Sequence, residues 1–430
     1  MIRLPWALLL AVAVAGSGQA QLTVSGELGW QGLAVPGAVN PLAATVTNGG
    51  GVPFAGELVV WQRIGSGWRG QAERELRVPV LLAPGGRARL RLPWPVEPGL
   101  RTVELRVEAD GHTAARAEVP VRLAGERIAA AVGPPPTPAP PGPLVVLNPD
   151  DLPDDPLFLT PFATVYLAPA ASLAPKAGEA LAAWAAFLGG RIVGRDAPPT
   201  VHTLSPDDLS AILRGHRARR PPLAALALAT VAYLVALGYA LPALARGERA
   251  WPLAAVASVA LGFALIYLNL VGMPETQISV QLSIQRSDIA RFNMDWLAVG
   301  DRRGGVWRGE GMWVEVLPGG GDWAGREVAW TWGPDGPQTT LSIAPGQVRF
   351  LWRLSPAAEF TGVALTVRDG GLVRADGEPM AMAELALAHR RLLGAVDPLL
   401  ADGDRVVLAS GVDRAPGRAA YVYRLRWEGP

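Results

Sequence analysis

The segment Thr102-Val103-Glu104-Leu105-Arg106-Val107 places an apolar residue at every second position. A period of two is typical of a β-strand with one buried face, because successive side chains of a strand point to opposite faces. Turn sequences such as Asn48-Gly49-Gly50 and Pro84-Gly85-Gly86 separate this segment from similar ones. Six or seven short strands without a helical stretch predict an immunoglobulin-like β-sandwich over residues 21–125. The other expected strands cover residues 23–28, 43–47, 57–61, 87–92 and 118–123.

A change of pattern comes after the predicted sandwich. The proline run at 134–143 is typical of a stiff, extended connection, so we assign residues 126–143 to a linker. Beyond it, short apolar strands and one amphipathic helix predict a small, truncated α/β module over residues 144–221. We expect Ser172 to cap that helix and Gly189-Gly190 to end it. The expected strands of this module are 144–147, 163–167 and 192–193.

Two uninterrupted apolar stretches of 22 residues each, 223–244 and 251–272, contain no charged side chain. About 20 apolar residues in a helix cross the ~30 Å hydrocarbon core of a bilayer. The connection at 245–250 is short, so we predict an antiparallel transmembrane hairpin over residues 222–272. A buried helical hairpin in a soluble protein is the alternative.

The first 20 residues carry one positive charge, an apolar core of about a dozen residues and small residues before Gln21, which is the pattern of a secretory signal peptide. An uncleaved N-terminal anchor is the alternative, and both predict export of the chain from Gln21 onward. Four arginines between 214 and 220 argue for the opposite orientation, since positive charge favours the cytoplasmic side. Long domains translocate largely regardless of charge. We therefore expect a cell-membrane protein with both β regions outside the cytoplasm.

Residues 273–430 return to β-rich segments separated by glycine-rich turns, which predicts a C-terminal, tryptophan-rich β-sandwich. Met382–Leu393 fits either a helix or a long strand. The expected fold class is thus multidomain and mainly β. The predicted order is a signal peptide at 1–20, a sandwich at 21–125, a linker at 126–143, an α/β module at 144–221, a membrane hairpin at 222–272 and a β domain at 273–430.

The composition excludes several kinds of chemistry. The 430 residues contain 39 basic and 38 acidic side chains, so a net charge of +1 gives no field that would attract nucleic acid. The chain has no cysteine, which excludes disulfides, thiolate metal sites and cysteine nucleophiles. The four histidines form no zinc-binding pair, and no serine lies in a nucleophile motif. We expect no enzyme and no cofactor.

One acidic cluster stands out in the sequence. Asp150, Asp151, Asp154 and Asp155 lie close together in a proline-rich segment. Clustered carboxylates outside the cytoplasm can hold calcium, which takes 6–8 oxygen ligands. The alternative is a solvated loop, because the alternating Asp-x-Asp-x-Asp-Gly pattern of a calcium loop is missing.

Tryptophan is the second candidate feature, with 15 residues in the chain. Trp330 and Trp332 are two apart and would share one strand face, with Trp313 on a neighbouring strand. Flat aromatic faces suit sugar rings or partner side chains. The alternative is that these tryptophans fill a sandwich core or lie at the level of the lipid headgroups.

Several short fragments occur in an order that resembles a group of poorly characterised bacterial envelope proteins. The fragments are Pro41-Leu42 with Val46-Thr47-Asn48, Ala180-Leu181-x-x-Trp184 with Gly189-Gly190, the hairpin around Tyr239, Leu244 and Arg249-Ala250-Trp251, and Gly370-Gly371-Leu372 through Leu393-Gly394. The resemblance implies an immunoglobulin-like domain, a degenerate glutamine-amidotransferase-like α/β region, paired membrane helices and a terminal β domain. Such amidotransferases use a cysteine that this chain lacks, so no catalytic residue carries over.

These observations favour a non-enzymatic, membrane-anchored envelope protein that acts as a scaffold or partner-binding component of a cell-envelope complex. Its expected partners are the membrane and another envelope protein, and no nucleic acid. The alternative is a protein that binds surface or cell-wall glycan through the tryptophan-rich domain. A hydrolase with an unrecognised site ranks third.

Overall fold

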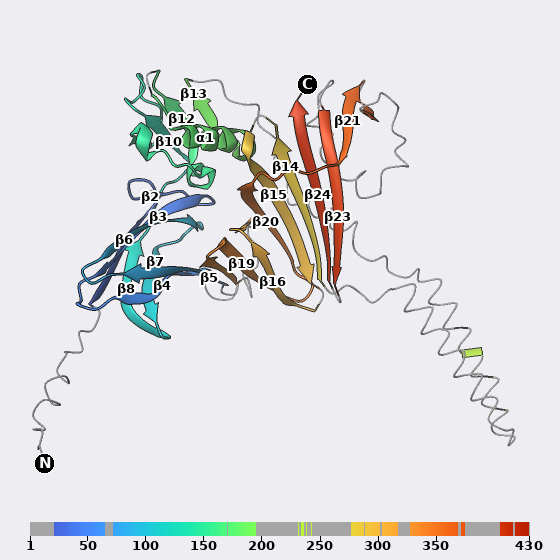
Figure 1. The fold of residues 1–430 in the computed structure, drawn as a ribbon, viewed down its shortest axis with the longest axis horizontal. Helices are drawn as coiled ribbons and strands as arrows, with labels where there is room; N and C mark the ends of the chain where they lie inside the picture. Colours follow the sequence, from blue (N-terminus) through green and yellow to red (C-terminus); the bar gives the residue numbers. More distant parts are fainter. Residues whose placement is uncertain are drawn as a thin grey trace, which may run out of the picture.

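The computed structural model describes residues 21–64, 72–169, 171–194, 277–287, 289–301, 303–316, 327–368, 371–374, 405–415 and 418–429, together with five positions between 231 and 242. Strands dominate this part of the chain and form several sheets, so the prediction of a mainly β protein is confirmed. Figure 1 shows these sheets gathered into one body, with the α/β region lying above the N-terminal strands.

The N-terminal region forms two sheets that share one core. Their facing apolar side chains include Leu42, Leu92, Leu58 and Leu105, which are all almost fully buried. In the strand Thr102–Ala109, alternate residues point into this core, as the period of two predicts. One sheet contains β1 (Leu22–Leu28), β3 (Val39–Asn48) and β6 (Arg87–Pro95), and the other contains β4 (Phe54–Ile64), β5 (Ala72–Leu82), β7 (Thr102–Ala109) and β8 (His112–Pro120). The short strands β2 (Leu33–Ala34) and β9 (Arg122–Leu123) pair separately.

The second N-terminal sheet continues into strands from the C-terminal half of the chain. β18 (Val328–Gly333) pairs in parallel with β5, from Val328 opposite Arg74 to Thr331 opposite Arg77. β19 (Gly336–Ile343) and β16 (Gly305–Glu310) then extend the sheet. Seven strands from two distant regions of sequence therefore form one sheet.

An eight-stranded sheet makes up the rest of the C-terminal region. One of its faces forms a second apolar core, which contains Leu282, Ile284 and Trp296 and packs against Phe187 of the helix. The strand order is β17 (Val314–Glu315), β20 (Val348–Pro356), β15 (Ile289–Asp301), β14 (Gln277–Arg286), β24 (Arg418–Gly429), β23 (Arg405–Ala415), β21 (Val363–Arg368) and β22 (Gly371–Arg374).

The α/β region is a four-stranded, all-parallel sheet with one helix, α1 (Pro175–Leu188), packed on it through the buried Trp184. Its order is β11 (Leu144–Leu147), β10 (Ile128–Val132), β12 (Phe162–Leu167) and β13 (Arg191–Val193). β10 was not predicted, because it lies within the segment that we assigned to the linker. Two 3₁₀ turns, η3 (Pro149–Asp151) and η4 (Pro156–Leu159), connect β11 to β12.

The ends of α1 test two predictions. The N-cap is Ala174 and no side chain caps it, so the assignment of Ser172 as the cap was wrong. Pro175 occupies the first turn instead, where its fixed φ suits a helix and its missing N–H would have no partner anyway. The predicted end is confirmed, because Gly189 adopts the left-handed conformation with φ 70°.

The α/β region is fastened to the N-terminal sandwich by buried hydrogen bonds. The Thr160 hydroxyl accepts the N–H of Val39 at 2.9 Å and donates to the Val39 carbonyl at 2.9 Å. The indole N–H of Trp30 donates to the Phe158 carbonyl at 3.0 Å.

Two buried ion pairs lie where the C-terminal strands meet the sandwich. Arg349 contacts Glu315 through Nε–Oε1 at 2.5 Å and Nη2–Oε2 at 2.7 Å. Arg74 lies 2.5 Å from Glu97. Burial raises the pKa of the Glu97 carboxyl, against the opposing effect of Arg74.

Within the described ranges, no helix combines the length and the apolar character that crossing a membrane requires. The two predicted spans, 223–244 and 251–272, lie outside those ranges apart from the five positions between 231 and 242. The predicted signal peptide at 1–20 and Met382–Leu393 also lie outside them.

Candidate functional site

Two of the three tryptophans that the sequence singled out lie in the core. Trp313 is 2% exposed and Trp330 is 1% exposed, and the Trp330 indole N–H donates to the Trp313 carbonyl at 3.0 Å. The Trp330 ring also contacts Trp94 edge-on, with 6.0 Å between ring centroids. Neither ring offers a flat face to a ligand. Trp332 lies two residues after Trp330 on β18, is only half-buried, and lines a cavity.

The four aspartates of the acidic cluster lie in and after the turn η3. Asp151 accepts a hydrogen bond from the Asn148 side-chain amide at 2.9 Å, while Asp150 and Asp154 are exposed. Asp155 accepts the N–H of Leu157 at 2.9 Å and thereby caps η4. Burial raises the pKa of the Asp155 carboxyl, an effect that this backbone hydrogen bond opposes.

Asp151 and Asp155 therefore stabilise turns. Among the residues that the structure describes, no group of three or more histidine, aspartate or glutamate side chains is placed to hold a metal ion.

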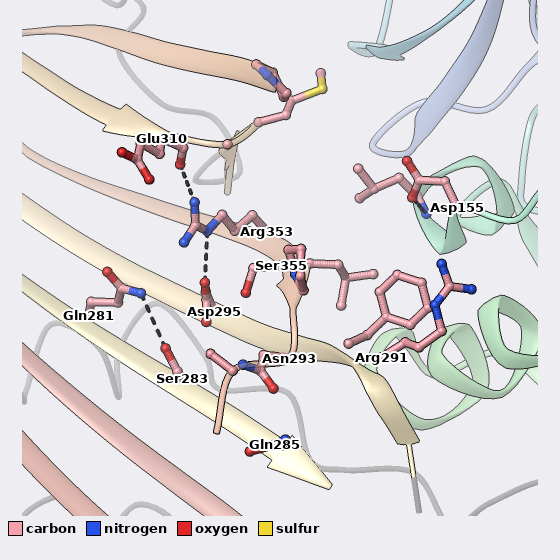
Figure 2. Close-up of a pocket in the computed structure, with 18 of the residues that line it drawn as sticks. Asp155, Gln281, Ser283, Gln285, Arg291, Asn293, Asp295, Glu310, Arg353 and Ser355 are labelled. Carbon is pink, nitrogen blue, oxygen red and sulfur yellow. Dashed lines mark hydrogen bonds and ion pairs between the residues drawn. The ribbon is translucent and has the colours of Figure 1, made fainter. Parts of the chain in front are cut away.

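The cavity that Trp332 lines has a volume of about 670 Å³. Its floor is the face of the eight-stranded sheet opposite the α1-packed core (Figure 2). Further along the same face, Leu297, Val299 and Leu351 pack into the core of the sandwich. The cavity therefore lies at the other end of this face, where the eight-stranded sheet has no apolar contact with the sandwich. Pro93, Asp155 and Leu157 contribute to its wall from the sandwich and the α/β region.

Polar side chains form two adjacent rows across the floor of the cavity. Strand register places Ser283 opposite Asp295 and Asp295 opposite Arg353. The next row contains Gln285, Asn293 and Ser355. Because alternate residues of a strand share a face, the apolar residues between these polar ones point into the core on the other side of the sheet.

Arg353 is held in the cavity by contacts on several sides. Its Nε donates to Asp295 Oδ2 at 2.8 Å, and its Nη1 donates to the Glu310 carbonyl. Its guanidinium lies 4.5 Å from the centroid of the Trp313 ring. Gly311 has φ +83°, and a Cβ atom there would lie 2.5 Å from Arg353 Nη1. The buried Trp313 thus supports a charged group of the cavity.

Three oxygen atoms of the polar rows have no hydrogen-bond partner among the residues that the structure describes. They are Asp295 Oδ1, Asn293 Oδ1 and Gln285 Oε1, on side chains that are at least nine-tenths buried. A buried acceptor without a partner costs about 1–3 kcal/mol, so native proteins rarely keep one without a reason. Nearby, the Gln281 amide donates to the Ser283 hydroxyl at 3.3 Å. The rows thus offer unused acceptors beside a positioned arginine.

The remaining walls are aromatic and apolar. Phe292, Trp332, Phe360 and Met312 line them. At the edge, Arg291 forms a half-exposed ion pair of 3.1 Å with Glu179 of α1, which contributes little stability. The arrangement can hydrogen-bond a polar ligand and cover its apolar surface.

These polar rows were not predicted from the sequence. Residues 273–430 were expected to contain β-rich segments, but the polar residues that share one strand face at 281–285 were not singled out. The signal was present, because Gln281, Ser283 and Gln285 alternate with apolar residues and carry no charge. Uncharged polar side chains at every second position indicate a polar face that is removed from bulk solvent.

A second cavity of about 540 Å³ lies in the α/β region beside the carboxyl ends of the parallel strands. Open parallel sheets bind ligands at this end. Its walls are mostly small apolar residues such as Ala168, Ala171 and Gly178. Glu179 is the charged side chain in its described lining, and it already pairs with Arg291.

No protein-family description and no curated protein matches the chain. Two solved structures share limited geometry with it. An alkylpurine DNA glycosylase from Pseudomonas fluorescens, bound to DNA containing an abasic site analog, has a TM-score of 0.19 and 13% identity over 24% of this chain and 31% of its own. A Paenibacillus sp. cycloisomaltooligosaccharide glucanotransferase, complexed with cycloisomaltoheptaose, has a TM-score of 0.17 and 7% identity over 35% of this chain and 20% of its own.

Proposed function

We propose that this protein is a non-enzymatic, membrane-anchored component of the bacterial cell envelope that binds another envelope protein through its β body. The observation that supports the membrane-anchored topology in this proposal is the parallel pairing of β5 with β18. Strands in one sheet must lie in one compartment, so the regions before and after the two apolar stretches share a side of the membrane. Two crossings by a hairpin at 222–272 satisfy this requirement, whereas a single crossing does not.

The proposed compartment is outside the cytoplasm. The signal pattern at 1–20 supports export of the chain beyond it. The finer architecture belongs to the same proposal: an immunoglobulin-like sandwich over 21–125 and a truncated, glutamine-amidotransferase-like module over 144–221, to which the structure adds β10 (Ile128–Val132) as an inner strand. The immunoglobulin-like sandwich is supported by a sheet of three N-terminal strands that faces a sheet containing four others. The α/β module is supported by an all-parallel sheet with a packed helix.

Single cysteines test the topology, because the chain has none of its own. Thr113 and Gln338 are exposed on β8 and β19, and Gly247 lies in the connection between the apolar stretches. An impermeant maleimide should label Thr113→Cys and Gln338→Cys on intact cells, and Gly247→Cys only after lysis. Labelling of Gly247→Cys alone would invert the topology.

The partner is tested separately. Affinity capture of the full chain from a detergent extract should recover a stable envelope protein. A chain that runs as a monomer and captures nothing specific contradicts the scaffold proposal.

Glycan binding is the second candidate function. Trp332 at the cavity supports it, although Trp313 and Trp330 are buried and offer no stacking face. Pelleting of the detergent-solubilised chain with purified cell wall tests this function. Absence of pelleting, together with unchanged tryptophan fluorescence on titration with polysaccharide, counts against it.

A further inference from the structure

We infer that the 670 Å³ cavity over β14, β15 and β20 binds a polyhydroxylated ligand such as one or two sugar rings. The inference deepens the glycan-binding candidate and assigns it a site, and it differs from a tryptophan platform because its polar contacts come from strand side chains. Cavities of ~300–1,000 Å³ that combine apolar walls with a few converging polar groups are typical small-molecule sites.

The unpartnered atoms identify the chemistry of the ligand. Asp295 Oδ1, Asn293 Oδ1 and Gln285 Oε1 are acceptors, so the ligand must supply hydrogen-bond donors. Figure 2 shows these three side chains on adjacent strands of the cavity floor, close to Arg353 and Ser355. Arg353 can only donate, so the ligand must also accept. A hydroxyl group does both.

Other ligand classes fit the same atoms less well. A phosphate or sulfate carries acceptor oxygens and would meet three more acceptors. A metal cation would find one carboxylate, that of Asp295, on the polar rows, and it is already paired with Arg353 at 2.8 Å. The rest of the cavity lining mixes acidic side chains (Asp155, Glu310 and Asp335) with basic ones (Arg291 and Arg424), and within the described residues no three acidic or histidine side chains are placed to hold a metal ion.

The walls match the apolar faces of a sugar ring. Trp332, Phe292 and Phe360 line the cavity beside the polar rows. Aromatic rings give large apolar contact while polar groups beside them fix orientation. A sugar presents both kinds of surface, since its C–H groups gather on the ring faces and its hydroxyls project from the edge.

The test uses the full chain in detergent and saturation-transfer NMR with glucose, galactose, mannose and N-acetylglucosamine as probes. We expect transfer to at least one sugar. Asn293→Leu removes an acceptor and keeps the side-chain size, so it should lower the affinity for that sugar at least about tenfold. Gln338→Leu makes the same kind of change at an exposed site outside the cavity lining and should leave affinity unchanged.

Thermal unfolding separates loss of binding from loss of fold. Asn293→Leu removes an unpartnered buried acceptor, so its melting transition should stay cooperative and near that of the wild type. The inference fails if none of the four sugars shows transfer, or if folded Asn293→Leu binds as well as the wild type. If that variant still pellets with cell wall, the protein binds glycan at another site and the inference about this cavity is wrong. If the wild type binds a sugar but does not pellet, the cavity is a sugar site but the proposed cell-wall function is wrong.

Discussion

Replacing Arg349 by methionine should destabilise the protein strongly. The Arg349 side chain is fully buried and Glu315 is 2% exposed, with two short contacts between the guanidinium and the carboxylate. Arg349 Nη1 also donates to the Ser342 carbonyl at 2.6 Å, which joins β20 to β19. Removing one partner of a buried ion pair costs about 3–5 kcal/mol, because the other charge stays buried without its counterion. We expect a loss of that size for Arg349→Met.

The double variant Arg349→Met with Glu315→Leu should be more stable than Arg349→Met alone. It removes both buried charges, and the lost Arg349 hydrogen bond leaves the Ser342 carbonyl without its donor, at a cost of about 1–3 kcal/mol. The two substitutions should therefore couple by about 2 kcal/mol. Arg308→Met on the exposed face of β16 is the matched control and should change stability by about 0.5 kcal/mol at most.

Urea unfolding of the full chain in detergent, followed by tryptophan fluorescence and circular dichroism, measures these differences. Coincidence of the two probes is needed before the midpoints are converted to free energies. Two results would refute the claim that this ion pair is buried where the C-terminal strands meet the sandwich. One is a loss of stability below about 1 kcal/mol for Arg349→Met. The other is a double variant whose loss equals the sum of the losses of the two single variants.

Single positions elsewhere in the chain give three more predictions. Gly311→Ala should cost about 1–3 kcal/mol in urea unfolding, since φ is +83° and a Cβ would meet the cavity arginine, whereas Gly346→Ala, with φ +75° and open space, should cost less. Trp330→Ala should cost about 3–5 kcal/mol because its ring is buried, and Trp332→Ala should cost clearly less; equal losses would contradict their different burial. Hydrogen bonding from Arg106 lowers the pKa of Glu104 below its ordinary value, although burial opposes it, so its contribution is present at neutral pH and is lost as pH falls through the folded-state pKa. The difference in free energy of unfolding between the wild type and Glu104→Gln should therefore decrease as the pH falls. A difference that stays constant from about pH 7 to the acid transition would contradict this.

Strand formation was readable in the sequence because it depends on local geometry. Side chains of a strand alternate between two faces, so the segment from Thr102 to Val107 shows its structure in its own pattern. The end of the helix at Gly189 was readable for the same reason, since a left-handed residue favours glycine. The prediction that Ser172 caps the helix was wrong because the helix begins at Pro175 without a side-chain cap. The strand β10 was not predicted because the proline run that comes after it led us to assign the whole segment to a linker.

Strand partners were decided by tertiary structure alone. An alternating pattern indicates which face of a strand is apolar but not which strand lies beside it, because every residue except proline offers the same backbone N–H and C=O groups. Nothing near Arg74 or Val328 indicates that β5 and β18 pair across some 250 residues of chain. That pairing joins the two β regions.

The candidate site illustrates the same division. The sequence determined that Gln281, Ser283 and Gln285 share a strand face, and that tryptophans are concentrated in the C-terminal region. Only the packed structure decided that Trp330 is buried while Trp332 reaches a cavity, and that Asn293 and Asp295 lie beside the glutamines. Burial depends on which surfaces meet, and a cavity forms where two sheets that are distant in sequence stop touching.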